Sequence, residues 1–263
     1  MQITIENCSS PGAHFSDNTN EVLVKIHKWI NDNNEPTLLF YEFRKRLERE
    51  KGINNNNGRN IFPLLKNCGF AEYTPGEILD TSCFFTSKGL AYVTGLESLK
   101  LIEQGEYTIE QKRKAAENME RVLQELIYDG VAKLLRNTES NYREGMKWFI
   151  MFLLEYGKVD RNEFAYMVYQ MNRDENNWQE KTRPVIEGYR SKELAIEVKV
   201  RVRNDQGIQQ RTGRTTRLEK KSFFTAYTYY AALYLQAGLT TKSGEYYYLK
   251  AEAEEKARKL LED

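Results

Sequence analysis

The sequence contains little of what disulfide-stapled and zinc-binding proteins require. Of its 263 residues, only three are cysteine and two are histidine. Cys8, Cys68 and Cys83 are odd in number and far apart, which favours a reducing compartment over a disulfide framework. His14 and His27 have no metal-binding spacing to these cysteines, so we expect no zinc site.

Long apolar runs are missing as well. No stretch approaches the roughly eighteen apolar residues of a membrane-spanning helix. The first part of the chain lacks the positive start and apolar centre of a secretory signal. Hydrophobic residues make up 40% and charged residues 29% of the chain, a balance typical of a soluble globular protein. We therefore predict a cytoplasmic protein with no membrane partner.

The motifs of several enzyme classes are also absent, namely the Gly-rich phosphate loop, GxSxG and HExxH. The catalytic-looking string that remains is Glu197-Val198-Lys199, within an alternating apolar stretch. In metal-dependent nucleases such an acid-x-Lys string holds Mg²⁺ through the carboxylate, and the lysine activates the attacking water. The site needs a second acid, for which the nearest upstream candidates are Glu180 and Glu187. A stand-alone Mg²⁺-dependent nuclease is therefore one alternative.

Apolar spacing near the N-terminus predicts three helices in succession. The first covers 20–33, and the second begins after Thr37, which can cap it. The third ends at Gly69, a residue suited to a left-handed helix end. Pro63 is tolerated only in a first helical turn, so we place the start of this third helix near Asn60.

A strand, a turn and a return strand follow this third helix. Residues 70–73 and 82–86 alternate as strands do, and Pro75 and Gly76 form a turn between them. Ser87 is the expected cap of a helix that ends near residue 104. The order helix, strand, turn, strand, helix is typical of the second half of a winged helix-turn-helix.

A degraded copy of the same order follows near the C-terminus. A helix stops at Gly157, Asp160 caps the next, and a long helix ends at Gly238 before a strand-turn-strand. We therefore predict a mainly α fold with short β-wings. It comprises an N-terminal arm over 1–19, a first winged-helix subdomain over 20–105, a helical linker subdomain over 106–141, and a second winged-helix subdomain over 142–263 with an insertion at about 172–210.

Basic residues cluster although the net charge is only +1. From Lys199 to Lys221 there are eight basic residues, opposed by Asp205 and Glu219. A local basic face on a neutral protein is typical of a duplex footprint, and a solvated charged loop is the alternative. Arginine pairs with guanine and asparagine with adenine at base edges. The predicted base-reading residues are Asn56, Asn57, Arg59, Asn60, Arg214 and Arg217.

Two further groups are predicted to contact DNA. Polar side chains of the arm would reach the duplex as a flexible N-terminal segment, namely Ser9, Ser10, His14, Ser16 and Asn18. Lysines and one arginine would contact phosphates, which position the protein without specifying the sequence. They are Lys45, Lys66, Lys88, Lys112, Arg113, Lys114, Lys220 and Lys221. We expect no catalytic residue and no metal in this set.

Two winged-helix subdomains with a helical linker and a preceding arm resemble the recognition region of type IIS restriction endonucleases of the FokI and BpuJI kind. The stretches that carry the resemblance are Arg59 to Phe70, RNIFPLLKNCGF, and the helix end from Tyr229 to Leu239. In that family the recognition region binds double-stranded DNA at a short asymmetric site. A separate nuclease domain cuts nearby with Mg²⁺.

The resemblance implies the recognition part of such an enzyme. This chain ends on a charged helix, so we expect the Mg²⁺-dependent nuclease domain to be absent from it and to be a partner within the parent protein. The chain itself is then non-catalytic, and the parent is a site-specific deoxyribonuclease. Two other interpretations stay open at this point: a winged-helix transcriptional regulator that binds a palindrome as a dimer, and a winged-helix module that binds protein.

Overall fold

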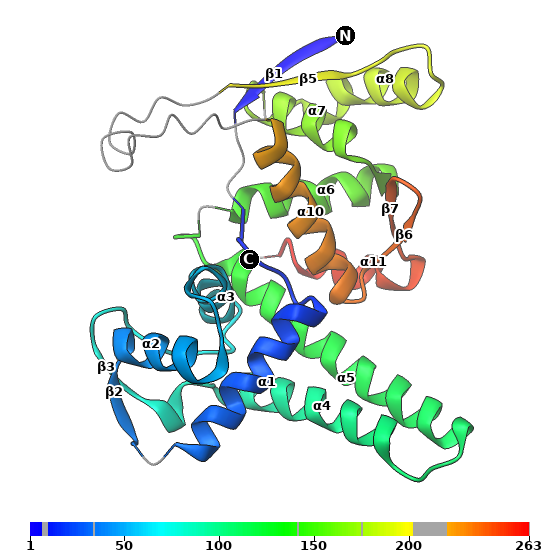
Figure 1. The fold of residues 1–263 in the computed structure, drawn as a ribbon. Coiled ribbons are helices and arrows are strands. Elements are labelled where there is room, and N and C mark those ends of the chain that lie inside the picture. Colours follow the sequence, from blue (N-terminus) through cyan, green and yellow to red (C-terminus); the bar gives the residue numbers. More distant parts are fainter. Residues whose placement is uncertain (7–9, 34, 141, 175, 202–219, 263) are drawn as a thin grey trace. The chain divides into compact units, whose positions relative to one another are not determined.

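The computed structural model describes residues 1–6, 10–33, 35–140, 142–174, 176–201 and 220–262. These residues are mainly helical with small sheets (Figure 1), which confirms the predicted class at this coarse level. The chain divides into two compact units: unit 1 comprises 1–10, 141–231 and 239–263, and unit 2 comprises 11–140 and 232–238. Within the described residues, no helix combines the length and apolarity needed to cross a membrane.

The described residues of unit 2 form five helices of its own and two short strands. In chain order they are α1 (Asp17–Asp32), β2 (Thr37–Leu39), α2 (Phe40–Lys51), α3 (Asn55–Asn67), β3 (Ile78–Asp80), the 3-10 turn η1 (Thr81–Cys83), α4 (Ser87–Gln104) and α5 (Ile109–Arg136). β2 and β3 pair antiparallel, with Thr37 opposite Asp80. Ala71 and Phe85 form an isolated antiparallel bridge. The predicted return strand over 82–86 is thus reduced to this bridge.

α3 begins at Asn55, so the predicted start near Asn60 is wrong. The asparagine run forms the first helical turn, in which the Gly58 amide donates to the Asn54 carbonyl at 3.2 Å. Pro63 lies inside the helix and leaves the carbonyl of residue 59 without a helical donor. Burial of Ile61 and its apolar neighbours offsets this loss, because tertiary packing supplies most helical stability.

Two predicted helix caps are also wrong. Thr37 lies in β2, and α2 begins after Leu39 with no side-chain cap. Thr86, not Ser87, caps α4: its hydroxyl accepts from the Gly89 amide at 3.1 Å and donates to the Gly69 carbonyl at 2.7 Å. Because its hydroxyl bonds both segments, Thr86 ties the start of α4 to the end of α3.

Aromatic side chains form the core of unit 2. Phe40 stacks on Tyr73 with ring centroids 4.3 Å apart, and Phe43, Phe62 and Phe84 pack around them. α4 and α5 run side by side (Figure 1), and α5 continues unbroken through Gly130. Absence of a side chain at Gly130 lets Cys68, the residue after α3, approach α5, because a Cβ at Gly130 would lie 3.0 Å from the Cys68 Cβ.

Unit 1 contains helices, a three-stranded sheet and a two-stranded sheet. In chain order the elements are β1 (Gln2–Glu6), α6 (Arg143–Tyr156), β4 (Lys158–Val159), α7 (Arg161–Met171), α8 (Trp178–Arg190), β5 (Glu197–Arg201), α10 (Lys220–Gln236, in unit 1 as far as Ala231), β6 (Thr240–Ser243), β7 (Tyr246–Leu249), the 3-10 turn η2 (Ala251–Ala253) and α11 (Glu254–Lys259). The sheet order is β4-β7-β6, all antiparallel.

Several local predictions for this part of the chain are confirmed. Gly157 and Gly238 follow the ends of α6 and α10 with φ of 72° and 74°. Asp160 caps α7 by accepting from the Asn162 and Glu163 amides, both at 2.8 Å. The strand-turn-strand near the C-terminus is present as β6 and β7.

The first residues form a strand instead of a flexible arm. β1 pairs parallel with β5, with Gln2 opposite Glu197, and the two lie alongside each other in Figure 1. Ile3, Ile5 and Val198 are buried where this pair packs on α7. The predicted arm is therefore wrong for residues 2–6, because alternate isoleucines gain more by burial than by exposure. β5 and α8 both come from the predicted insertion.

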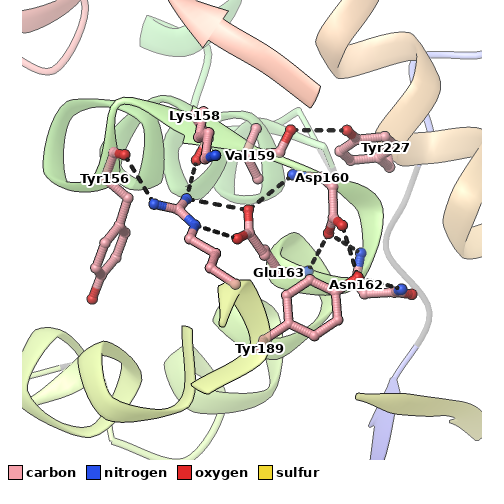
Figure 2. Close-up of polar contacts among 9 residues, drawn as sticks. Tyr156, Lys158, Val159, Asp160, Asn162, Glu163, Tyr189 and Tyr227 are labelled. Carbon is pink, nitrogen blue, oxygen red and sulfur yellow. Dashed lines mark hydrogen bonds and ion pairs between the residues drawn. The ribbon is translucent and has the colours of Figure 1, made fainter. Parts of the chain in front are cut away.

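A buried polar cluster fastens α8 to the start of α7 (Figure 2). The carboxylate of Glu163 is fully buried and accepts from Arg190 Nε at 2.6 Å. Arg190 Nη2 also donates to the Lys158 carbonyl at 2.8 Å, and the Tyr189 hydroxyl donates to Asp160 Oδ2 at 2.8 Å. Burial raises the pKa of Glu163, against the smaller lowering effect of Arg190. A charged pair thus holds the insertion on the unit.

Candidate nucleic-acid interface

The outward face of α3 is polar and carries no acid. Residues at helical spacing share a face, and Arg59, Asn60, Pro63 and Lys66 are the exposed positions of the described side chains. The opposite face is buried, with Leu64, Leu65 and Cys68 fully covered. Asn56 and Asn57 lie in the first turn of α3, and their side chains are outside the described part. The helix therefore presents Arg59 and Asn60 outward, as predicted, although they lie one turn inside it.

A hollow of about 290 Å³ lies between α2, α3 and the loop that contains Gly76. We call it the α2–α3 hollow. Its walls are Phe40, Tyr41, Arg44, Gly58, Arg59, Phe62, Pro63, Tyr73, Pro75 and Gly76. Two arginines and four aromatic rings line it, and no carboxylate is among the lining residues. Such a surface suits an anionic, partly aromatic ligand such as a nucleotide chain, since arginine binds phosphate and aromatic faces stack on bases.

Tyr41 and Lys45 extend this surface along α2. The Lys45 ammonium lies 4.3 Å from the centre of the Tyr41 ring. The hydrogen bond that the Lys45 ammonium donates to the Tyr41 hydroxyl raises the pKa of Lys45, which favours its charged form. Both side chains are exposed. Lys45 therefore remains a candidate for phosphate contact beside the hollow.

The other cations of α2 are occupied by carboxylates. Arg46 pairs with Glu35 at 2.7 Å and Arg49 with Glu50 at 2.6 Å. Lys51 lies 3.6 Å from Asp32. These pairs neutralise the far side of α2, so its positive charge is concentrated near α3.

Two of the five predicted arm residues, His14 and Ser16, form hydrogen bonds that hold the segment before α1 in place. Ser16 caps α1 by accepting from the Thr19 amide, and His14 shares a hydrogen bond of 3.0 Å with Gln236. Burial lowers the pKa of His14. Asn18 is exposed on α1, Ser10 is half-buried, and Ser9 lies outside the described residues.

The segment before α1 nevertheless adjoins α3. Gly12 has φ of +77°, and a Cβ there would lie 3.3 Å from Asn60 Oδ1. Pro11, Ala13 and Phe15 are buried, and Phe15 packs 5.2 Å from Phe70. This alternation of buried side chains is a signal that sequence reasoning missed.

Of the phosphate contacts predicted on α4 and α5, those in the first turns of α5 lie far from α3, whereas Lys88 lies beside Asp129, where α5 meets the end of α3. Lys88 lies 3.4 Å from Asp129, Lys112 donates to the Glu103 carbonyl at 2.8 Å, and Arg113 pairs with Glu117 at 3.0 Å. Lys114 is exposed in the same first turns of α5. α3 packs on α5 near Gly130, which at 1.5 Å per residue is about 25 Å further along the helix.

The predicted residues of unit 1 receive less support. Arg214 and Arg217 lie outside the described residues, as do the side chains of Lys220 and Lys221. The described part of α10 is largely core, since Tyr227, Tyr230 and Tyr234 are buried. We infer no base-reading face from α10.

Glu197 and Lys199 stand exposed on the outward face of β5. Gln2 of the paired strand donates to Glu197 Oε2 at 3.2 Å. Among the described residues, no group of three or more His, Cys, Asp or Glu side chains is placed to hold a metal ion. Glu180 and Glu187 are exposed on α8.

Sequence reasoning missed Tyr41 and Arg44 as members of this surface. They precede and follow the buried Phe43 on α2, so helical periodicity alone marks them as outward-facing. Their position beside Arg59 follows only from the packing of α2 on α3. Comparisons of the chain with protein-family models, with curated proteins and with solved structures find no match.

Proposed function

We propose that this chain binds double-stranded DNA sequence-specifically, with the outward face of α3 as the reading element. The observation that carries the proposal is the acid-free face of α3, with Arg59 and Asn60 exposed next to the α2–α3 hollow. A helix in the major groove contacts base edges from its N-terminal residues. Arginine and asparagine are the side chains that make bidentate contacts there.

The order of the elements supports a winged-helix arrangement of each unit. Unit 2 runs α1, β2, α2, α3, β3, α4, with β2 paired to β3. Unit 1 runs α6, β4, α7, α10, β6, β7, α11, with α8 and β5 inserted before α10 and the sheet order β4-β7-β6. In this arrangement α3 is the recognition helix of unit 2, and the loop at Gly76 is its wing.

The proposal includes the role implied by the family resemblance. The chain then serves as the target-recognition part of a type IIS restriction endonuclease, and a separate Mg²⁺-dependent domain cuts the DNA. A winged-helix transcriptional regulator is the competing role. The two differ in the symmetry of the site, because a dimeric regulator binds a palindrome whereas this recognition part binds an asymmetric sequence.

The test begins with selection of bound duplexes from a random pool. Affinities for the selected duplex and for a random duplex are then measured at one salt concentration for Arg59→Ala and Asn60→Ala. We expect each to lose about 5- to 150-fold on the selected duplex, the equivalent of one bidentate contact, and to change little on the random duplex.

Arg49→Ala is the matched control, since Arg49 lies on α2, is exposed and is paired with Glu50. It should leave both affinities unchanged. Equal losses of Arg59→Ala on the selected and random duplexes would refute base reading by α3. A pool that yields no enriched sequence would refute sequence-specific binding.

A further inference from the structure

A second hollow lies at the other end of α3 and is also confined to unit 2. Its volume is about 500 Å³. The residues that line it are Lys66, Asn67, Ala71, Glu72, Thr86, Lys133, Arg136 and Asn137. They come from the last turns of α3 and α5 and from the segment that joins α3 to α4. We call this the α3–α5 hollow.

The balance of charge in the α3–α5 hollow is positive. Three cations face one carboxylate, that of Glu72. The C-terminal ends of α3 and α5 each contribute roughly half a negative charge, so the sum is about +3 − 1 − 1, or about +1. In the described part of the chain, Lys66, Lys133 and Arg136 form no ion pair, although Lys66 donates to the Tyr73 carbonyl at 2.9 Å. These cations are therefore available to an external anion.

The backbone at Gly69 holds Lys133 over the hollow. Gly69 has φ of +74°, and a Cβ there would lie 2.6 Å from Lys133 Nζ and 2.7 Å from Lys133 Cδ. The stem of the lysine therefore lies directly on the glycine, where any side chain would displace it. Arg136 follows three residues later on α5 and so shares its face.

Amide groups complete the lining. Asn137 Nδ2 donates to Asn67 Oδ1 at 3.4 Å, at the upper limit for such a bond. The hollow thus offers cations and amide donors together, the combination that binds phosphate oxygens. A volume of this size accommodates more than one phosphate group and falls in the range of ordinary ligand sites.

We propose that the α3–α5 hollow binds a phosphate group, with Lys66, Lys133 and Arg136 as its charged contacts. The group comes either from a DNA backbone or from a free phosphate-bearing molecule. The first source rests on the proposed function. Lys66 is seven residues beyond Arg59, about 10 Å along α3, which is close to the major-groove width of about 12 Å. A helix that reads bases at Arg59 therefore places the hollow at a groove wall.

The salt dependence of binding tests the DNA source. Affinity of the full chain for a random duplex is measured over a range of salt for the wild type and for Lys133→Ala with Arg136→Ala. Each lost phosphate contact lowers the slope of log affinity against log salt by about 0.9, so we expect a fall of about 1.8. The charge-keeping pair Lys133→Arg with Arg136→Lys should retain the slope.

Arg258→Ala with Lys259→Ala is the matched control. It removes the same two charges from α11, where both side chains are paired with glutamates one turn away. The control should leave the slope unchanged. A fall equal to that of the α5 pair would overturn the assignment, because it would reflect net charge alone.

Titration with inorganic phosphate and with pyrophosphate tests the free source. The amide resonances of Gly69 and Thr86 should shift in the wild type and stay in place in Lys133→Ala with Arg136→Ala. If phosphate shifts these amide resonances but the alanine pair does not change the salt slope of duplex binding, the site is assigned to a free phosphate-bearing molecule. Shifts in a chain that binds no duplex would refute the proposed function and leave the phosphate site standing.

A change in neither measurement would overturn the inference. Lys133 and Arg136 would then only stabilise the negative C-terminal end of α5. In that case the double alanine variant would have a lower melting temperature but unchanged binding of ligands. Failure of the Arg59 test alone would leave the phosphate site intact, since the two sets of variants share no residue.

Discussion

Replacing Arg190 with methionine removes the partner of a fully buried carboxylate. Arg190 donates to both oxygens of Glu163, at 2.6 and 3.3 Å, and to the carbonyls of Tyr156 and Lys158 at 3.4 and 2.8 Å (Figure 2). Methionine fills similar space but offers no donor. Breaking a buried pair from one side costs about 3–5 kcal/mol, because the remaining charge stays buried without compensation. We expect a loss of that size in the free energy of unfolding at pH 8.

The loss should depend on pH in a definite direction. Burial already holds the pKa of Glu163 above its ordinary 4.5, and removal of Arg190 takes away a lowering effect. A carboxyl whose folded pKa is raised contributes less stability as pH rises from about 4.5 through the folded pKa. The difference between wild type and Arg190→Met is therefore largest at pH 8 and smaller at pH 5.

Urea unfolding followed by tryptophan emission measures this difference. Trp178 is buried at the start of α8, with its ring 6.2 Å from that of Tyr156, so release of α8 changes its share of the emission, to which Trp29 and Trp148 also contribute. Arg183→Met on the same helix is the matched control. Arg183 pairs with Glu155 at 2.8 Å but its side chain is 60% exposed, so we expect a loss under about 1 kcal/mol.

Two results would refute the reasoning. One is a loss for Arg190→Met no larger than that of the control, and the other is a loss that is the same at pH 5 and pH 8. Replacement of both Glu163 and Arg190 by methionine should recover most of the stability, because no buried charge is then left alone.

Three further perturbations test the packing of unit 2. Gly89→Ala should lower the free energy of unfolding by about 1–3 kcal/mol or more, measured as a lower melting temperature, because the new Cβ would fall 1.8 Å from the Phe70 carbonyl oxygen. Burial raises the pKa of Cys68 to about 12, so this thiol should react with a thiol reagent only after unfolding. The exposed Cys83 should react at once, and mass spectrometry of the labelled protein measures both reactions. Burial lowers the pKa of His14, so its contribution to stability should be complete above about pH 6.5 and lost as pH falls through the folded pKa, as urea unfolding across this range can show.

Each of these predictions has a control. Gly188→Ala, where the nearest atom to a new Cβ is 3.5 Å away, should be neutral or gain up to about 1 kcal/mol. Labelling is best done in a Cys8→Ser background, and fast reaction of Cys68 in the folded protein would contradict its burial. His14→Gln should flatten the pH dependence of the free energy of unfolding. An unchanged dependence would show that another group causes it.

Helix ends could be predicted where the residue at the end, or a bond to an amide a few residues away, is enough to stop or start the helix. Gly157 and Gly238 adopt positive φ, and Asp160 bonds amides two and three residues away, so neighbouring residues suffice for these decisions. The prediction failed at Ser87 because Thr86 competes with it for the same amide. It failed at Thr37 because pairing with Asp80, far along the chain, makes that residue a strand.

The candidate interface was predicted only in part. Arg59 and Asn60 were placed on the outward face of α3 from its apolar stripe, and the structure has them exposed. Pro63 predicts a helix start near Asn60, but burial of the residues around it allows the helix to begin at Asn55. Arg44 was missed because membership of the α2–α3 hollow depends on how two helices pack.

The sequence by itself determined the mainly helical class, most helix positions and the exposed polar face of α3, because caps, breakers and periodicity act over a few residues. Only the tertiary structure decided which distant segments meet. It pairs β1 with β5 across nearly two hundred residues, and it brings Lys133 of α5 onto Gly69 after α3. Such contacts form because burial of apolar faces outweighs the entropy of closing long loops, and no local pattern records that balance.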